Sequence, residues 1–180
     1  SCSDEEAIFK SPDDVIERID MVIEQDSDKE YIYLQNQQAN SATDLVKFGY
    51  YGSDANKMDF TLQLDANRKL IFRIYNQVDP YFWTNENTSY TLYSNKNLNS
   101  VYRYVTAEIS SNGETSYTSN LGNLFPSETQ VDVFKIIQYD EEHHEMLVHF
   151  ENFPLAHSSS SNLNTIMING TFRGALTFNQ

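Results

Sequence analysis

All four histidines of the 180-residue chain lie within one short segment, between positions 143 and 157. The stretch DEEHHEMLVH (140–149) adds carboxylates to three of them, and imidazole and carboxylate groups are ligands for Zn²⁺ or Cu²⁺. His143 and His144, however, are adjacent at a predicted hairpin tip, and neighbouring side chains of a strand point to opposite faces. The helical H-E-x-x-H spacing is also absent. The pattern therefore predicts a polar turn and no metal site, with His149 on an exposed strand face.

Two acidic stretches carry oxygen ligands at roughly alternate positions, a spacing that suits Ca²⁺. They present Asp54, Asn56 and Asp59 in one stretch, and Asp26, Asp28 and Glu30 in the other. Neither stretch matches the complete EF-hand loop. We expect solvated turns at both places, with a weak Ca²⁺ site as the alternative, and we predict no other cofactor.

The stretch VDPYFWTNENTSY (78–90) contains the single tryptophan, Trp83, directly after Tyr81 and Phe82. Three consecutive aromatic residues after a proline cannot all point into a core. Exposed rings beside Asn, Glu and Thr suit stacking on a sugar or docking of a partner. Tyr81, Phe82 and Trp83 are therefore the candidate residues for binding a partner or ligand. The alternative is that Phe82 and Trp83 close one end of the core.

The single cysteine, Cys2, lies beside an acidic run. A lone cysteine in a secreted chain is a free thiol, half of an intermolecular disulfide or a lipid attachment point. A catalytic thiolate needs a pocket and an activating base, whereas the neighbouring carboxylates oppose formation of a thiolate. We therefore do not expect Cys2 to be catalytic.

Motifs that would indicate an enzyme are missing. The many carboxylates could supply the acid–base pair of a glycosidase, but the chain contains no G-x-S-x-G elbow, P-loop or G-x-G-x-x-G motif. We do not expect an enzyme, and a hydrolase is kept only as a third hypothesis.

The net charge of −14 argues against a nucleic-acid partner, because such a field repels the phosphate backbone. Residues 1–30 hold eleven Asp and Glu against three Lys and Arg. We interpret this local excess as a solvated tail and an exposed helix face.

The first predicted secondary-structure element lies in the stretch KSPDDVIERIDMVIEQ (10–25). The apolar stripe at a 3.6-residue period consists of Val15, Ile16, Ile19, Val22 and Ile23. The start signals are Ser11 as N-cap, Pro12 at the first helical position, and Asp13 and Asp14 near the positive end of the helix dipole. The pattern predicts an amphipathic helix over about 12–25 that packs on the body.

After this segment the period changes to two. MDFTLQLD (58–65) alternates cleanly and KLIFRIYN (69–76) returns after the turn DANR, which predicts a hairpin. The other predicted strands are 30–35, 45–51, 89–94, 101–109, 131–139, 145–153 and 164–178. About eight or nine strands linked by turns predict a mainly β fold, an antiparallel sandwich or a calycin-like barrel, with one N-terminal helix.

The expected organisation is a tether over residues 1–10 followed by one β-rich domain over 11–180. The sequence contains no apolar run of the length that a membrane-spanning helix requires.

The opening SCSDEE resembles the processing site of a bacterial lipoprotein. The resemblance implies that Ser1 is the last residue of a signal peptide and that Cys2 carries the lipid. The following Ser3, Asp4, Glu5 and Glu6 are similar to the acidic export signal of Bacteroidota surface lipoproteins, which directs them to the outer face of the outer membrane.

The end of the chain strengthens this resemblance. IMINGTFRGALTF (166–178) is similar to the closing strand of small β-rich Bacteroidota lipoproteins of unknown function, which often end in I-x-G-T-F-x-x-x-L. The preceding VFKIIQYDEEHHEMLVHFENF (133–153) resembles their lead-in. Gly170 is expected to mark a bulge or kink in the last strand. The family has no agreed activity.

Together, these observations predict a surface-exposed outer-membrane lipoprotein that acts as a non-catalytic accessory or scaffold subunit. Its partner would be an outer-membrane protein complex such as an importer, a barrel-assembly machine or a secretion channel. The alternative is a stand-alone lipoprotein that binds a glycan or a small ligand.

Overall fold

The computed structural model describes residues 17–36, 45–51, 54–77, 86–93, 103–120, 131–142, 145–159 and 164–175. These ranges form eleven strands: β1 (Glu17–Gln25), β2 (Asp28–Asn36), β3 (Val46–Tyr51), β4 (Asp54–Gln63), β5 (Arg68–Asn76), β6 (Thr88–Leu92), β7 (Arg103–Ser111), β8 (Glu114–Thr118), β9 (Phe134–Asp140), β10 (Glu145–His157) and β11 (Thr165–Ala175). They contain no helix. The prediction of a mainly β fold is confirmed.

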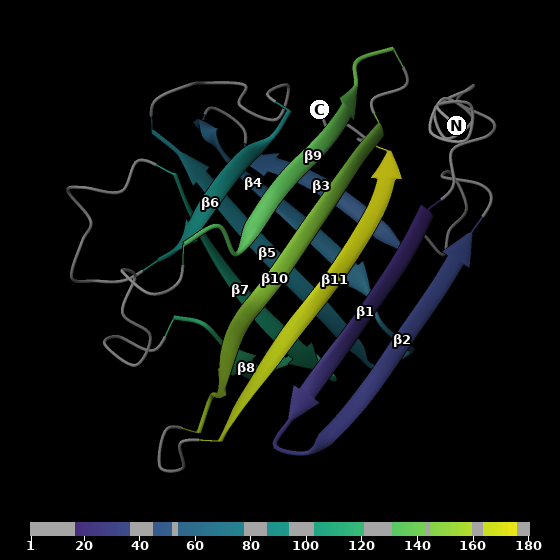
Figure 1. Ribbon diagram of the computed structural model, residues 1–180, viewed down its shortest axis with the longest axis vertical. Helices are drawn as coiled ribbons and strands as arrows, with labels where there is room; N and C mark the ends of the chain where they lie inside the picture. Colours follow the sequence, from purple (N-terminus) through teal and green to yellow (C-terminus); the bar gives the residue numbers. More distant parts are fainter. Residues whose placement is uncertain are drawn as a thin grey trace.

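The strands are arranged as two layers that cross one another (Figure 1). β9, β10, β11, β1 and β2 lie side by side in the front layer, and β3, β4, β5 and β7 lie behind them. The hydrogen-bonded order is β2-β1-β11-β10-β9-β6-β7-β5-β4-β3, and every pair is antiparallel except β6 with β7. The N-terminal hairpin β1–β2 therefore shares the front layer with the last three strands, β9 to β11.

Two short strands close part of this sheet into a barrel. β6 joins β9 of the front layer to β7 of the rear layer, and β8 joins β7 to β10. The ring β10-β9-β6-β7-β8 is thus a closed five-stranded barrel. The remaining strands extend its walls, with β11, β1 and β2 beyond β10 and β5, β4 and β3 beyond β7.

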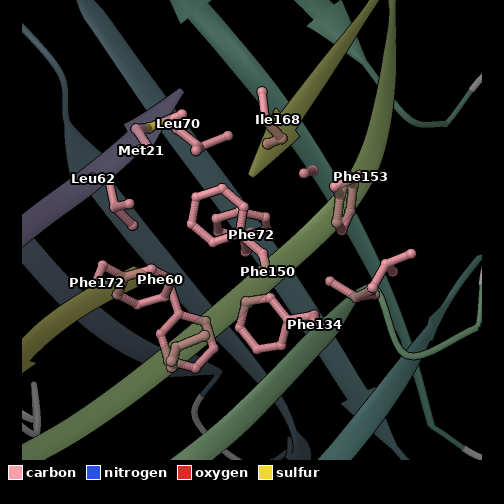
Figure 2. Close-up of a cluster of buried hydrophobic side chains, with 14 of the residues drawn as sticks. Met21, Phe60, Leu62, Leu70, Phe72, Phe134, Phe150, Phe153, Ile168 and Phe172 are labelled. Atoms are coloured by element: carbon pink, nitrogen blue, oxygen red, sulfur yellow. The ribbon is translucent and has the colours of Figure 1, made fainter. Parts of the chain in front are cut away.

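Phenylalanine side chains fill the space between the two layers (Figure 2). Phe72 of β5 lies at their centre, fully buried, and its ring centroid is 5.0 to 5.8 Å from those of Phe134, Phe150, Phe153 and Phe172. Edge-to-face and tilted pairs at such distances add to the free energy gained by burying each ring. This packing holds the crossed layers together and leaves their interior occupied by side chains.

An ion-pair cluster links the layers at the edge of the molecule. The guanidinium of Arg68, at the start of β5, donates to both carboxylate oxygens of Glu30 in β2, at 2.9 and 2.7 Å. Its Nε also donates to Asp65 at 2.7 Å. The hydrogen bonds from Arg68 lower the pKa of the Glu30 and Asp65 carboxyls below their usual values.

The predicted N-terminal helix over 12–25 is wrong for residues 17–25, which form strand β1, while residues 12–16 lie outside the described ranges. The inward side chains of β1 are Ile19, Met21 and Ile23, at period two. Ile19 and Ile23 satisfy both the helical and the strand period, so the stripe was ambiguous. Hydrogen bonding to β2 on one side and to β11 on the other stabilises the strand over the helix. The β-branched residues of this segment also favour a strand.

The sequence predicts about eight or nine strands, fewer than the eleven observed. The difference arises because β1 was predicted as a helix and β8 was not predicted as a strand. β8 has the polar sequence ETSYT and follows a turn at Asn112 and Gly113, so its sequence is typical of a loop. The predicted hairpin is confirmed, with β4 and β5 paired antiparallel across the turn at 65–67.

The bulge predicted at Gly170 lies instead in the neighbouring strand. The register of β10 against β11 shifts between Phe150 and Phe153, opposite Gly170 and Ile168. Gly170 serves a different purpose, since a Cβ atom there would lie 2.6 Å from the Cβ of Met21 in β1. Only a residue without a side chain permits this close approach of β11 to β1.

Candidate functional site

A groove of about 330 Å³ lies on the outer face of the front layer. It is lined by Asp20, Met21, Val22, Tyr31, His149, Asn169, Gly170 and Thr171. These residues come from β1, β2, β10 and β11, the four strands that run side by side in Figure 1. The same alternation that buries Ile19, Met21 and Ile23 places the even-numbered residues of β1 on this face.

The register of the strands arranges the outer side chains in two rows across the sheet. The first row contains Tyr33, Asp20, Thr171 and His149, and the second contains Tyr31, Val22 and Asn169. Met21 and Gly170, which pair with each other between the rows, complete the lining. Cross-strand neighbours lie close enough for one ligand to contact several of them.

Tyr31 is the most exposed large apolar side chain of the described residues, with 75% of its surface accessible. Its ring forms one wall of the groove at the edge strand β2. Tyr33, two residues further along the same face, is 61% exposed and donates its hydroxyl to Gln35 Oε1 at 2.9 Å. An exposed ring on a rigid strand gives contact area at low entropic cost.

Polar groups surround the apolar floor. The N–H of Asn152, in the bulge of β10, donates to Asn169 Oδ1 at 2.8 Å, which leaves the amide nitrogen of Asn169 as a donor. His149 Nε2 lies 3.5 Å from Glu151 Oε2. Among the residues that the structure describes, the side chains of Asp20 and Thr171 make no hydrogen bond. The groove therefore offers a carboxylate acceptor, an amide donor and a hydroxyl.

A second cluster of aromatic side chains lies on the outer face of the rear layer. The rings of Tyr75 and Tyr104 stack at 4.5 Å, Tyr93 lies 5.1 Å from Tyr104, and Lys57 Nζ is 5.6 Å from the centre of the Tyr75 ring. Burial and the neighbouring tyrosines raise the pKa of the Tyr104 hydroxyl. The three tyrosines of this cluster are partly buried.

Most of the residues that the sequence singled out lie outside the described ranges. These are Cys2, Ser3, Asp4, Glu5, Glu6, Tyr81, Phe82, Trp83, His143 and His144. His149 is described, and its place on the outer face agrees with the predicted strand position. His157 packs edge-on against Tyr117 at 5.3 Å, away from the groove.

Two of the acidic residues proposed as calcium ligands contact arginines. Glu30 accepts two hydrogen bonds from Arg68, and Asp59 Oδ1 lies 3.6 Å from Arg73 Nε. Within the described ranges, no three His, Cys, Asp or Glu side chains gather as a metal site would require.

Sequence reasoning missed the groove. Its one local signal was the pair of tyrosines in EYIYLQ, which alternate on a strand. The other lining residues become neighbours only through the pairing of β1 with β11, whose partners are about 150 positions apart along the chain.

Comparison with known proteins gives no relative for this chain. No protein-family description, no curated protein and no solved structure matches it. None of the described segments is a helix with the length and apolarity needed to cross a bilayer.

Proposed function

We propose that this protein is a non-catalytic accessory subunit of an outer-membrane protein complex, held at the cell surface by lipid on Cys2. The observation that carries the proposal is the edge strand β2, which has one neighbour among the described strands and displays Tyr31 and Tyr33. The proposed anchor rests on the SCSDEE start alone. Two or three acyl chains, at about 0.8 kcal/mol per buried CH₂, would hold such a domain at a membrane.

The hairpin geometry shows which backbone groups β2 offers to a partner. β1 and β2 are joined by the two-residue turn at Asp26 and Ser27, and the closing pair is Gln25 with Asp28. In such a hairpin the closing pair exchanges both hydrogen bonds, and the pattern then alternates. The N–H and C=O groups of Tyr31 and Tyr33 are therefore directed away from β1, toward the open edge.

A partner strand could add to this edge. Strand addition supplies main-chain hydrogen bonds, while side chains at alternate positions give specificity. Exposed edge strands are normally protected because they invite such pairing. The tyrosines on β2 are large aromatic side chains of the kind that contributes most to protein interfaces.

The packed interior supports a surface-based role. The rings around Phe72 occupy the space in which a calycin-type barrel would hold a ligand. Within the part of the chain that the structure describes, the outer faces and edges of the sheet are therefore the surfaces that remain for binding.

The test is purification of the tagged full-length chain from detergent-solubilised membranes of a Bacteroidota host, followed by mass spectrometry. We expect an acylated N-terminal peptide at Cys2 and a stoichiometric integral β-barrel partner. Tyr33→Pro removes one outward N–H at an edge where proline is tolerated, and it should release the partner. Tyr33→Thr also removes the ring but keeps that N–H, so it should weaken binding less than Tyr33→Pro does. A chain that elutes alone, or one that keeps its partner after Tyr33→Pro, would refute edge pairing.

A further inference from the structure

We propose that the outer groove between Tyr31 and His149 is a binding site for neutral sugar units of a glycan. The inference concerns the outer face of the sheet, whereas the proposed partner pairs with the backbone edge of β2, and the two sites share the Tyr31 ring. It rests on an exposed ring, an apolar floor and hydrogen-bonding groups that the strand register brings together.

The ring of Tyr31 supplies the stacking surface. A pyranose has an apolar face of C–H groups, and aromatic side chains with an accessible face are suited to cover it. Three quarters of the Tyr31 surface is accessible, and the floor beside it consists of the Val22 side chain and of Met21 and Gly170 between the two rows. The side chain of Met21 points into the core, so Met21 and Gly170 contribute backbone atoms to this floor.

The hydroxyl groups of the sugar would meet complementary groups at the rim of this floor. Asp20 and Thr171 are directly paired across β1 and β11, and His149 follows Thr171 across β10. The carboxylate of Asp20 accepts from two hydroxyls, and the amide nitrogen of Asn169 donates to another. Asn169 is held in this orientation by the N–H of Asn152.

These polar groups argue against a purely apolar occupant. An acyl chain or an apolar peptide would cover the carboxylate of Asp20 without supplying a hydrogen bond, which is unfavourable. A sugar satisfies both the apolar floor and the polar rim. The volume of about 330 Å³ lies at the lower end of the range of about 300–1,000 Å³ for small-ligand sites, so it fits a short segment of a glycan.

The charge of the protein selects neutral sugars over acidic ones. The chain carries a net charge of −14, Asp20 lies in the groove, and Glu151 stands 3.5 Å from His149 at its border. A uronic or sialic acid would bring another negative charge into this field. Few contacts and an open site predict weak binding, with Kd on the order of 1 mM for a single short chain.

The test is a glycan array screened with the soluble full-length chain, containing neutral gluco-, manno-, xylo- and galacto-oligosaccharides beside polygalacturonate and sialylated chains. Titration calorimetry or NMR then measures affinity for the neutral oligosaccharide that binds best. Tyr31→Ala should weaken binding by about tenfold or more, and Asp20→Asn by about fivefold, while Tyr31→Phe keeps the stacking ring and retains binding.

Tyr33→Ala is the matched control, since Tyr33 is exposed on the same strand but does not line the groove. It should leave sugar affinity within about twofold of the unmodified chain. Circular dichroism melting shows that each variant is folded, which we expect because Tyr31 and Tyr33 are exposed. The proposal is overturned if no neutral glycan binds, if acidic glycans bind better, or if Tyr31→Ala and Asp20→Asn leave the affinity unchanged. Asp20 lies on β1 and not on the edge strand, so loss of sugar binding by Asp20→Asn with the membrane partner retained would separate this site from the proposed edge contact.

Discussion

Replacing Phe72 with alanine should cost more stability than most single substitutions in this protein. The side chain is fully buried, and its ring has four phenylalanine neighbours with centroids within 5.8 Å. Loss of the buried apolar surface costs about 2 kcal/mol, and the broken ring pairs and residual cavity add about 1–3 kcal/mol. We expect the free energy of unfolding to fall by about 3–5 kcal/mol.

The measurement is chemical denaturation at neutral pH, followed by circular dichroism. Phe72→Leu is the matched variant, because it retains much of the volume and should lose only about 1–2 kcal/mol. The cavity left by alanine is lined by aromatic rings, so benzene should bind the variant and restore part of its stability, without a comparable effect on the unmodified chain. A loss below about 1 kcal/mol for Phe72→Ala would show that the interior is not packed as described.

Two further substitutions test the contacts between layers and strands. Gly170→Ala should destabilise by about 2 kcal/mol or more in thermal denaturation, because the new Cβ would overlap the backbone of β1, whereas Gly49→Ala, with open space around the position, should change stability by less than about 1 kcal/mol. Arg68→Met should cost roughly 1 kcal/mol or less, since the ion pairs are solvent-exposed and screened. The carboxyls of Glu30 and Asp65 have lowered pKa values, so their stabilising effect is present above the unfolded-state values of 4.5 and 3.8 and is lost as pH falls below them. Acid denaturation curves of Arg68→Met should therefore converge with those of the unmodified chain below these values, and a constant difference across the range would contradict the role of the cluster.

Local patterns predicted the strands whose alternation is clean and whose turns are short. The hairpin of β4 and β5 is an example, because Met58, Phe60, Leu62 and Leu64 lie on one face and Asp65 accepts hydrogen bonds from the turn backbone. β1 was misread since its spacing fits two periods, and the choice between them is made by partners far along the chain. β8 carries too little apolar character for any local rule to find it.

The candidate groove was less accessible to sequence reasoning than the fold. The outer-face position of His149 followed from alternation within its own strand. Its proximity to Asp20 did not, because that depends on Thr171 lying between them in the sheet. Residue types alone also gave no reason to prefer Tyr31 over the eleven other tyrosines, since exposure is decided by the position of β2 at the edge of the front layer.

The pairing of β1 with β11 has a consequence for how the chain folds. A two-stranded hairpin such as β1–β2 is only marginally stable by itself, and its other neighbour, β11, lies about 150 positions further along the chain. The front layer is complete only when Met21 of β1 pairs with Gly170 of β11. Such long-range pairing slows folding and keeps the early hairpin exposed to other chains in the meantime. The front layer is therefore expected to form only after β11 has been synthesised, so the β1–β2 hairpin lacks its second neighbour until then.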